Sequence, residues 1–154
     1  MTIDMNKKLP RPAGHHTVTP GFSVEGSVKV LEFLQKGLGA EVVDRYDMPN
    51  GTIAHAEVRI GDSVVMFGEA MKDHGHPAMP ASLSLYVENG NAVDATYKRA
   101  LAAGATSVME PANAFYGYRS ATLRDPGGNK WTICAVVEEL TKAEIEARMA
   151  NQKQ

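Results

Sequence analysis

Hydrophobic and polar positions along the chain describe one order of elements that occurs twice. In the first half, residues 17–24 are β-prone, and Ser27 is the predicted cap of a helix with helically spaced apolar positions. These positions are Val30, Leu31, Leu34 and Leu38, and Gly37 and Gly39 end the helix. Strands are predicted over 41–46, 52–60 and 64–67, separated by turn signals that contain glycine.

The same order returns in the second half. A strand is predicted over 82–87, a helix over 91–103, and further strands over 106–109, 118–124 and 130–136. Thr141 and Glu144 form a capping-box pattern at the start of a last helix. Each half is therefore a strand, a helix and three strands, which predicts an α+β protein with an internal repeat.

The repeat also predicts the division of the chain. We expect an N-terminal arm over 1–14, a first unit over 15–68, a linker over 69–80, a second unit over 81–137, and a C-terminal helix and tail over 138–154. A crevice between two similar units collects side chains from both, so a site is expected where they meet.

Strand alternation separates an apolar face from a polar face. The residues predicted to pack beneath the helices are Val18, Phe22, Val24, Ala54, Ala56, Val58, Ile60, Leu83, Leu85, Val87, Trp131, Ile133 and Ala135. The opposite faces carry mainly hydroxyls. They are either the solvated side of two sheets or the lining of a cavity. Several of them have few lysines and glutamates, which favours the cavity.

Composition narrows the functional classes. The chain has 154 residues, 44% of them hydrophobic and 22% charged, and a net charge of −2 gives no reason to expect a nucleic-acid partner. The single cysteine, Cys134, excludes an internal disulfide. No apolar run approaches the roughly 20 residues of a membrane span, and the first 14 residues lack the apolar region of a signal peptide. We therefore expect a cytoplasmic protein with no membrane partner.

The order of motifs resembles the PhnB-like branch of the vicinal oxygen chelate superfamily, which includes glyoxalase I, extradiol dioxygenases and bleomycin-resistance proteins. The runs that carry the likeness are Phe115-Tyr-Gly-Tyr-Arg-Ser-Ala-Thr-Leu-Arg-Asp-Pro-Gly-Gly-Asn-Lys-Trp-Thr-Ile, Ile53-Ala-His-Ala-Glu-Val-Arg-Ile-Gly-Asp-Ser and Thr19-Pro-Gly-Phe. This resemblance implies two βαβββ modules with curled mixed sheets, often completed across a homodimer, and a ligand on the concave face.

Enzymes of this superfamily hold a divalent metal through His or Glu at the first strand and a late strand of each module. The matching positions here are Thr19, Met66, Ser82 and Thr132, and none of these side chains is a good ligand for such a metal. We therefore expect no metal cofactor at the usual site.

Other side chains remain candidates for chemistry. His55 and Glu57 share a polar strand face, so His55 is either a base or ligand contact, or a structural histidine. Tyr116, Tyr118 and Arg119 are expected at the rim of a pocket, with a salt bridge as the other role for Arg119. The remaining residues expected to contact a ligand are Ser84, Tyr86 and Thr122. His74 and His76, with Asp73, lie in the Gly- and Pro-containing linker, where a solvated or interface loop is the simpler interpretation.

These observations favour a homodimeric protein that binds a small organic molecule without a catalytic metal. The alternative is an enzyme: a metal-dependent glyoxalase-like lyase or isomerase, or a dioxygenase, with displaced ligands such as His55 and Glu57, or a metal-free enzyme with His55 as base.

Overall fold

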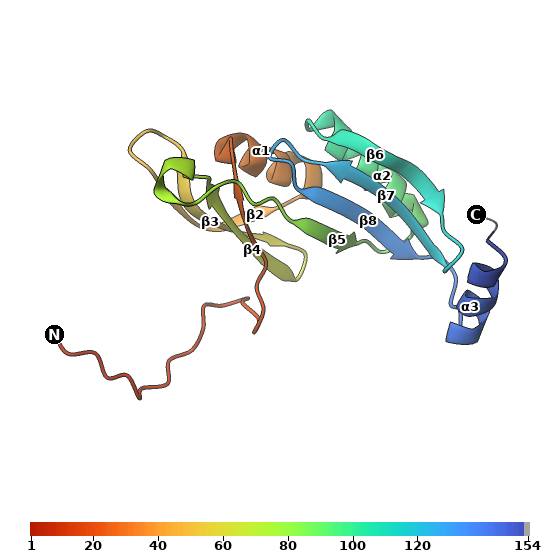
Figure 1. Cartoon of the computed structure of the whole chain (residues 1–154), viewed down its shortest axis with the longest axis horizontal. Helices are drawn as coiled ribbons and strands as arrows, with labels where there is room; N and C mark the ends of the chain where they lie inside the picture. Colours follow the sequence, from red (N-terminus) through yellow and green to blue (C-terminus); the bar gives the residue numbers. More distant parts are fainter. Residues whose placement is uncertain (153–154) are drawn as a thin grey trace.

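The computed structural model describes residues 1–152 and contains two four-stranded mixed sheets that do not close into a barrel (Figure 1). The first module contains β1 (Gly21–Val24), α1 (Ser27–Leu38), β2 (Glu41–Asp47), β3 (Ile53–Ile60) and β4 (Ser63–Glu69). The second contains β5 (Ser82–Tyr86), α2 (Gly90–Ala102), β6 (Thr106–Asn113), β7 (Tyr118–Arg124) and β8 (Lys130–Val136). The strand orders are β1-β4-β3-β2 and β5-β8-β7-β6, with a parallel pair at β1/β4 and at β5/β8. The predicted α+β fold of two βαβββ modules is confirmed.

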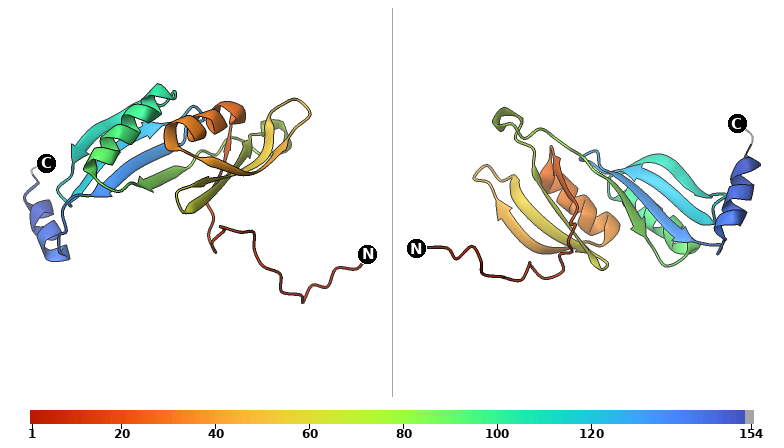
Figure 2. Two further views of the ribbon diagram at one scale, coloured as in Figure 1. Left: turned by 180° about the vertical axis from the view of Figure 1, so that it is seen from behind. Right: turned by 60° about the horizontal axis from the view of Figure 1, so that its bottom comes forward.

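Both helices lie on the same side of the two sheets, next to each other (Figure 2). Arg99 of α2 donates from Nε to the carbonyl of Gly37, 2.9 Å away, near the end of α1 where a cation is favourable. We call the sheet face that is turned away from the helix the open face of each module.

The N-terminus of α1 is capped from the end of β4, not by Ser27. The carboxylate of Glu69 accepts hydrogen bonds from the backbone N–H groups of Gly26 and Ser27, at 2.9 and 3.0 Å, and from the Ser27 hydroxyl at 2.8 Å. Gly26, in the left-handed region at φ 77°, is the actual N-cap. Ser27 is fully buried, and its Oγ accepts from the backbone of Ile53 instead. A negative charge at a helix N-terminus stabilises it, so Glu69 joins β4 to α1.

The turn between β7 and β8 joins the two modules. The carboxylate of Asp125 is 5% exposed and accepts hydrogen bonds from the backbone of Gly127 and from Asn129 and Trp131, at 2.8 to 3.0 Å. Asn129 is fully buried, and its Oδ1 accepts from the backbone N–H of Ala81, at the end of the linker. A buried carboxylate needs such donors to offset the loss of hydration.

Two packing expectations for the strands are wrong. Val18 is 82% exposed because β1 begins only at Gly21, and the preceding residues form a loop. Ala54 is exposed while Ile53 is fully buried, because a register shift between β2 and β3 reverses the alternation at the start of β3. The other predicted apolar positions are buried or partly buried against the core.

The linker and the C-terminal segment also have defined structure. The linker contains a short 3-10 helix, η1 (Lys72–His74), and α3 (Lys142–Ala150) begins after Thr141, whose Oγ1 accepts from the backbone of Glu144. Helix α3 projects beyond the second sheet (Figure 1). Residues 153 and 154 of the predicted tail lie outside the described residues. No helix in the described part of the chain is long and apolar enough to span a membrane.

Replacing Gly127 by alanine should destabilise the protein by about 1–3 kcal/mol, because overpacking a filled core has this cost. A Cβ atom at Gly127 would lie 2.6 Å from Val30 and 2.8 Å from Val24, both in the first module. Urea unfolding measures the change. Gly21→Ala is the matched control, since its Cβ would lie 3.6 Å from the Met66 carbonyl, an ordinary contact. Equal stabilities of the two variants would contradict this account of the junction.

Candidate functional site

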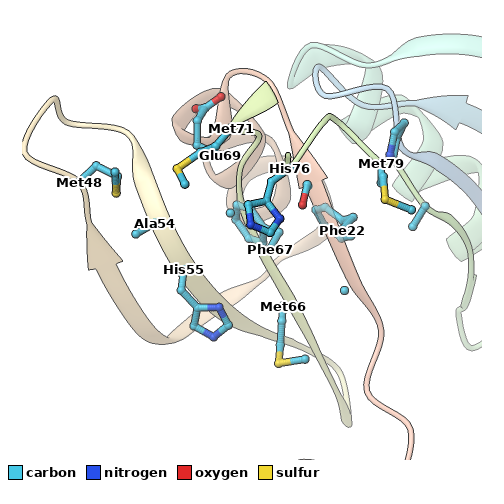
Figure 3. A pocket seen from close by; sticks show the side chains of 15 residues that line it. Phe22, Met48, Ala54, His55, Met66, Phe67, Glu69, Met71, His76 and Met79 are labelled. Carbon is cyan, nitrogen blue, oxygen red and sulfur yellow. The ribbon is translucent and has the colours of Figure 1, made fainter. Parts of the chain in front are cut away.

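A cavity of about 660 Å³ lies on the open face of the first module (Figure 3). Strands β1, β3 and β4 form its floor, where alternation places Gly21, Ser23, His55, Met66 and Gly68 on the face opposite α1. Gly21, Gly68 and Ala54 have little or no side chain, so they leave space above the strands. At Gly68 no larger residue fits, since a Cβ atom would lie 2.4 Å from the carbonyl oxygen of Ala54.

The linker forms a wall of this cavity. Met79 pairs with Ser23 through two backbone hydrogen bonds, of 2.8 and 3.3 Å, so the linker lies along the free edge of β1. Met71 and His76 are held together by backbone hydrogen bonds of 2.6 and 2.9 Å, and both side chains line the cavity. Four methionines therefore line the cavity: Met48, Met66, Met71 and Met79 (Figure 3). Thioether side chains adapt to irregular apolar shapes, so these walls suit an apolar ligand.

One carboxylate at the edge of the cavity holds two histidines. Oε2 of Glu57 lies 2.9 Å from Nε2 of His55, which lines the cavity. Oε1 of Glu57 lies 2.6 Å from Nε2 of His15, which follows the predicted N-terminal arm over 1–14. The side chains of His15 and Glu57 are 9% and 13% exposed, and that of His55 is 44% exposed. The expected pairing of His55 with Glu57 is therefore present, and His15 joins it.

The open face of the second module carries hydroxyls and aromatic rings. Ser84 and Thr132 are register partners, and the hydroxyl oxygens of Thr132 and Thr122 lie 3.3 Å apart. The rings of Tyr86 and Tyr118 meet edge to face at 6.2 Å, and Tyr116 lies 5.4 Å from Tyr118. Hydrogen bonding to Tyr118 is the main cause that raises the pKa of Tyr86. The expected residues on this face thus lie together, on a different sheet from His55 and Met66.

The four positions that match the superfamily's metal ligands carry hydroxyl and thioether side chains, and they lie in different parts of the fold. Thr19 lies in the loop before β1, and its hydroxyl donates to the carbonyl of His16 at 3.2 Å. Met66 is opposite Gly21 in the first sheet, whereas Ser82 and Thr132 belong to the second sheet. Among residues 1–152, no group of three His, Cys, Asp or Glu side chains is arranged to hold a metal ion.

Arg119 does not lie at the rim of a pocket on the open face. Alternation along β7 puts it on the helix side, where its Nε and Nη2 donate to the two carboxylate oxygens of Asp94 at 2.8 and 3.0 Å. This hydrogen bond lowers the pKa of Asp94. Arg119 shares a strand face with Ala121 and Leu123, which are buried on the helix side of the sheet. Of the two roles predicted for Arg119, the structure therefore shows the salt bridge.

The space between the modules is smaller than the cavity of the first module. It has a volume of about 240 Å³ and is lined mainly by apolar side chains, including Ile60, Leu83 and Trp131. The expected crevice between the two halves therefore exists, but the larger hollow lies between the first module and the linker. The sequence does not identify His15 and His76 as site residues, because periodicity carries no information about segments outside regular strands. Met79 fits a cavity lining by residue type, but from sequence core or interface packing is the simpler interpretation.

Comparison with known proteins agrees with this architecture. The model of the family described as the Glyoxalase/Bleomycin resistance protein/Dioxygenase superfamily matches residues 15–133. An uncharacterised protein of Mycobacterium tuberculosis (strain ATCC 25618 / H37Rv) is 30% identical over 144 residues, which covers 88% of this chain and 83% of that protein.

Solved structures show the same fold at lower identity. A PhnB protein from Bacillus cereus, described as a putative 3-demethylubiquinone-9 3-methyltransferase, has a TM-score of 0.62 at 19% identity, with 78% of this chain and 99% of that chain covered. TioX from Micromonospora sp. ML1 has a TM-score of 0.60 at 22% identity, with 82% and 100% covered.

Cys134 should react slowly in the native protein. Its side chain is buried beneath the open face of the second module, and burial raises the pKa of its thiol, although hydrogen bonding to Tyr86 offsets part of the rise. Because the thiolate is the reactive form, we expect modification by a disulfide reagent at pH 8 to be at least about tenfold slower than in urea. Absorbance of the released thiolate measures both rates. Equal rates would show that Cys134 is accessible.

Proposed function

The chain belongs to the glyoxalase/bleomycin resistance protein/dioxygenase superfamily, and from this premise we propose that it binds a small organic molecule in the cavity of the first module, without a catalytic metal. The observation that carries the proposal is the cavity itself: about 660 Å³ of space with methionine and phenylalanine in its lining and few polar groups. Ligand sites of this size combine apolar walls with a few polar groups that orient the ligand.

The charges around the cavity favour a neutral or weakly polar ligand. None of the described residues that line it is a lysine or an arginine. Its one carboxylate, that of Glu69, already accepts three hydrogen bonds at the start of α1. An anion would find no cation to replace its hydration, so we expect an apolar, ring-containing compound with few polar atoms.

The proposal includes a homodimer in the cytoplasm. The open face of the second module leaves Tyr86 63% exposed, and the edge strand β6 leaves Val108 and Met109 49% and 56% exposed. Exposed apolar and aromatic groups of this kind occur at interaction sites. A second copy of the chain is the partner that the family resemblance supports, and its first module would then face this surface.

The alternative function is a metal-free enzyme with His55 as general base. The hydrogen bond that His55 donates to Glu57 favours it, because a carboxylate that orients an imidazole is a common arrangement in acid–base catalysis. The lyase, isomerase or dioxygenase with a displaced metal remains the second form of this alternative, with His55 and Glu57 as ligands.

Ligand binding should appear as thermal stabilisation. At a free concentration of about 100 Kd, a ligand adds about 2.7 kcal/mol to the free energy of unfolding, which raises Tm by roughly 5–10 °C for a chain of this size. A panel of one-ring and two-ring aromatic compounds should include such ligands. Ala54→Phe fills the cavity from an exposed floor position and should abolish the shift, whereas Ala102→Phe, exposed on α2, should retain it.

Two outcomes would overturn the binding proposal. One is a set of Tm shifts that Ala54→Phe leaves unchanged. The other is stoichiometric transition metal in the untagged protein, measured by elemental analysis, that is lost on replacing His55, which would favour the metal-dependent enzyme.

If the protein is a dimer, analytical ultracentrifugation of the wild type should give the mass of two chains. Tyr86→Glu places a charge on the open face of the second module and should shift the protein towards the monomer, with Tm largely retained, since Tyr86 is exposed within one chain. A Val137→Glu variant, partly exposed near the end of β8, is the control for an added charge. A monomeric wild type at micromolar concentration would contradict the dimer.

A further inference from the structure

The N-terminal segment contributes a residue to the edge of the cavity. His15 lies in the loop before β1, yet its side chain is 9% exposed and its Nε2 lies 2.6 Å from Oε1 of Glu57. The other oxygen of the same carboxylate lies 2.9 Å from Nε2 of His55. One carboxylate therefore connects the N-terminal segment to a side chain that lines the cavity.

The segment is held against the open face of β4 by more than this contact. Gly14 packs on Val64, which is only 4% exposed although it lies on the open face, and the carbonyl of Pro20 accepts from the backbone of Met66. Turns within the segment are closed by a bond from the backbone of His15 to Pro12 and from the Thr19 hydroxyl to His16. His15 is thus presented by a folded stretch of chain.

Hydrogen-bond chemistry then limits the state of both imidazoles. Carboxylate oxygens only accept, so Nε2 of His15 and Nε2 of His55 must each carry a proton. Nδ1 of His15 lies 3.3 Å from the carbonyl of Ala13, another pure acceptor, so both ring nitrogens of His15 have a partner. His55 has its carboxylate partner at Nε2, which leaves its Nδ1 to accept a hydrogen bond on the cavity side.

We propose that His15 and Glu57 are positioning residues that hold His55 in the Nε2–H form, so that the cavity selects ligands that donate a hydrogen bond to Nδ1 of His55. The ligand class is a neutral aromatic hydroxyl compound, with its rings against the methionines. This inference rests on the proposed function. Without His15, the carboxylate of Glu57 loses one of its two contacts and can turn away from His55. The Nδ1–H tautomer of His55 then forms as well, and because Nδ1 is a donor in that tautomer, the selection is lost.

The first test needs no ligand. Nitrogen-15 NMR of the imidazoles in the free protein at pH 7.5 should show His55 with a proton on Nε2 and none on Nδ1. In His15→Ala the Nδ1 signal should shift towards the protonated position. His16→Ala is the matched control, because its exposed ring is the next residue of the same segment. A wild-type His55 protonated on Nδ1, or a spectrum that His15→Ala leaves unchanged, overturns the proposal.

The second test uses a pair of probes that differ by one donor. The wild type and His16→Ala should bind 2-naphthol about tenfold more tightly than 2-methoxynaphthalene, the range that one buried hydrogen bond supplies. In His15→Ala and Glu57→Gln the ratio should fall towards one, whereas affinity for the ether should change little. Equal affinities in the wild type overturn the selection. If neither probe binds, the proposed cavity function fails, and the NMR result by itself decides whether His15 positions His55.

Discussion

The buried carboxylate of Asp125 organises the contact between the two modules. It accepts four hydrogen bonds, three from donors in its own turn and one from the Trp131 side chain on β8, and this shapes the turn that carries Gly127. Gly127 then packs against the core of the first module, while Asn129 holds the backbone of Ala81 where the linker enters β5. The position of the linker, and hence one wall of the cavity, depends on these bonds.

A second carboxylate, that of Glu69, decides the chemistry of the cavity. It stands beside the cavity at the end of β4, but the helix N-terminus and the Ser27 hydroxyl take up its hydrogen-bonding capacity. The remaining lining is apolar apart from His55, His76 and Ser23. A structural requirement of α1 therefore occupies the hydrogen-bonding capacity of this carboxylate, and the other lining side chains suit a neutral compound.

The two copies of the repeat have diverged on their open faces. The first presents methionines, a histidine and a carboxylate beneath a folded N-terminal segment, and the second presents hydroxyls and three tyrosines. The same strand order supports both surfaces, because open-face residues do not enter the core and can change without affecting it. This is why a shared fold leaves the function of each face to its own side chains.

The sequence alone determined the fold, because periodicity reports which side of a strand or helix is apolar. β7 and β8 were predicted with the bounds they have, and the helix positions Val30, Leu31, Leu34 and Leu38 are buried as expected. The pairing of His55 with Glu57 also followed from alternation, since residues two apart on a strand share a face.

Only the tertiary structure decided what surrounds those residues. It turned Arg119 towards Asp94, gave the α1 cap to Glu69, and brought His15 and His76 to the cavity from segments without periodicity. Such contacts join residues that are distant in sequence, Gly26 and Glu69 or His15 and Glu57, and local pattern carries no information about them. The helices and strands could be predicted from the sequence. Which residues form the site depended on how the loops and the N-terminal segment fold back onto the strands.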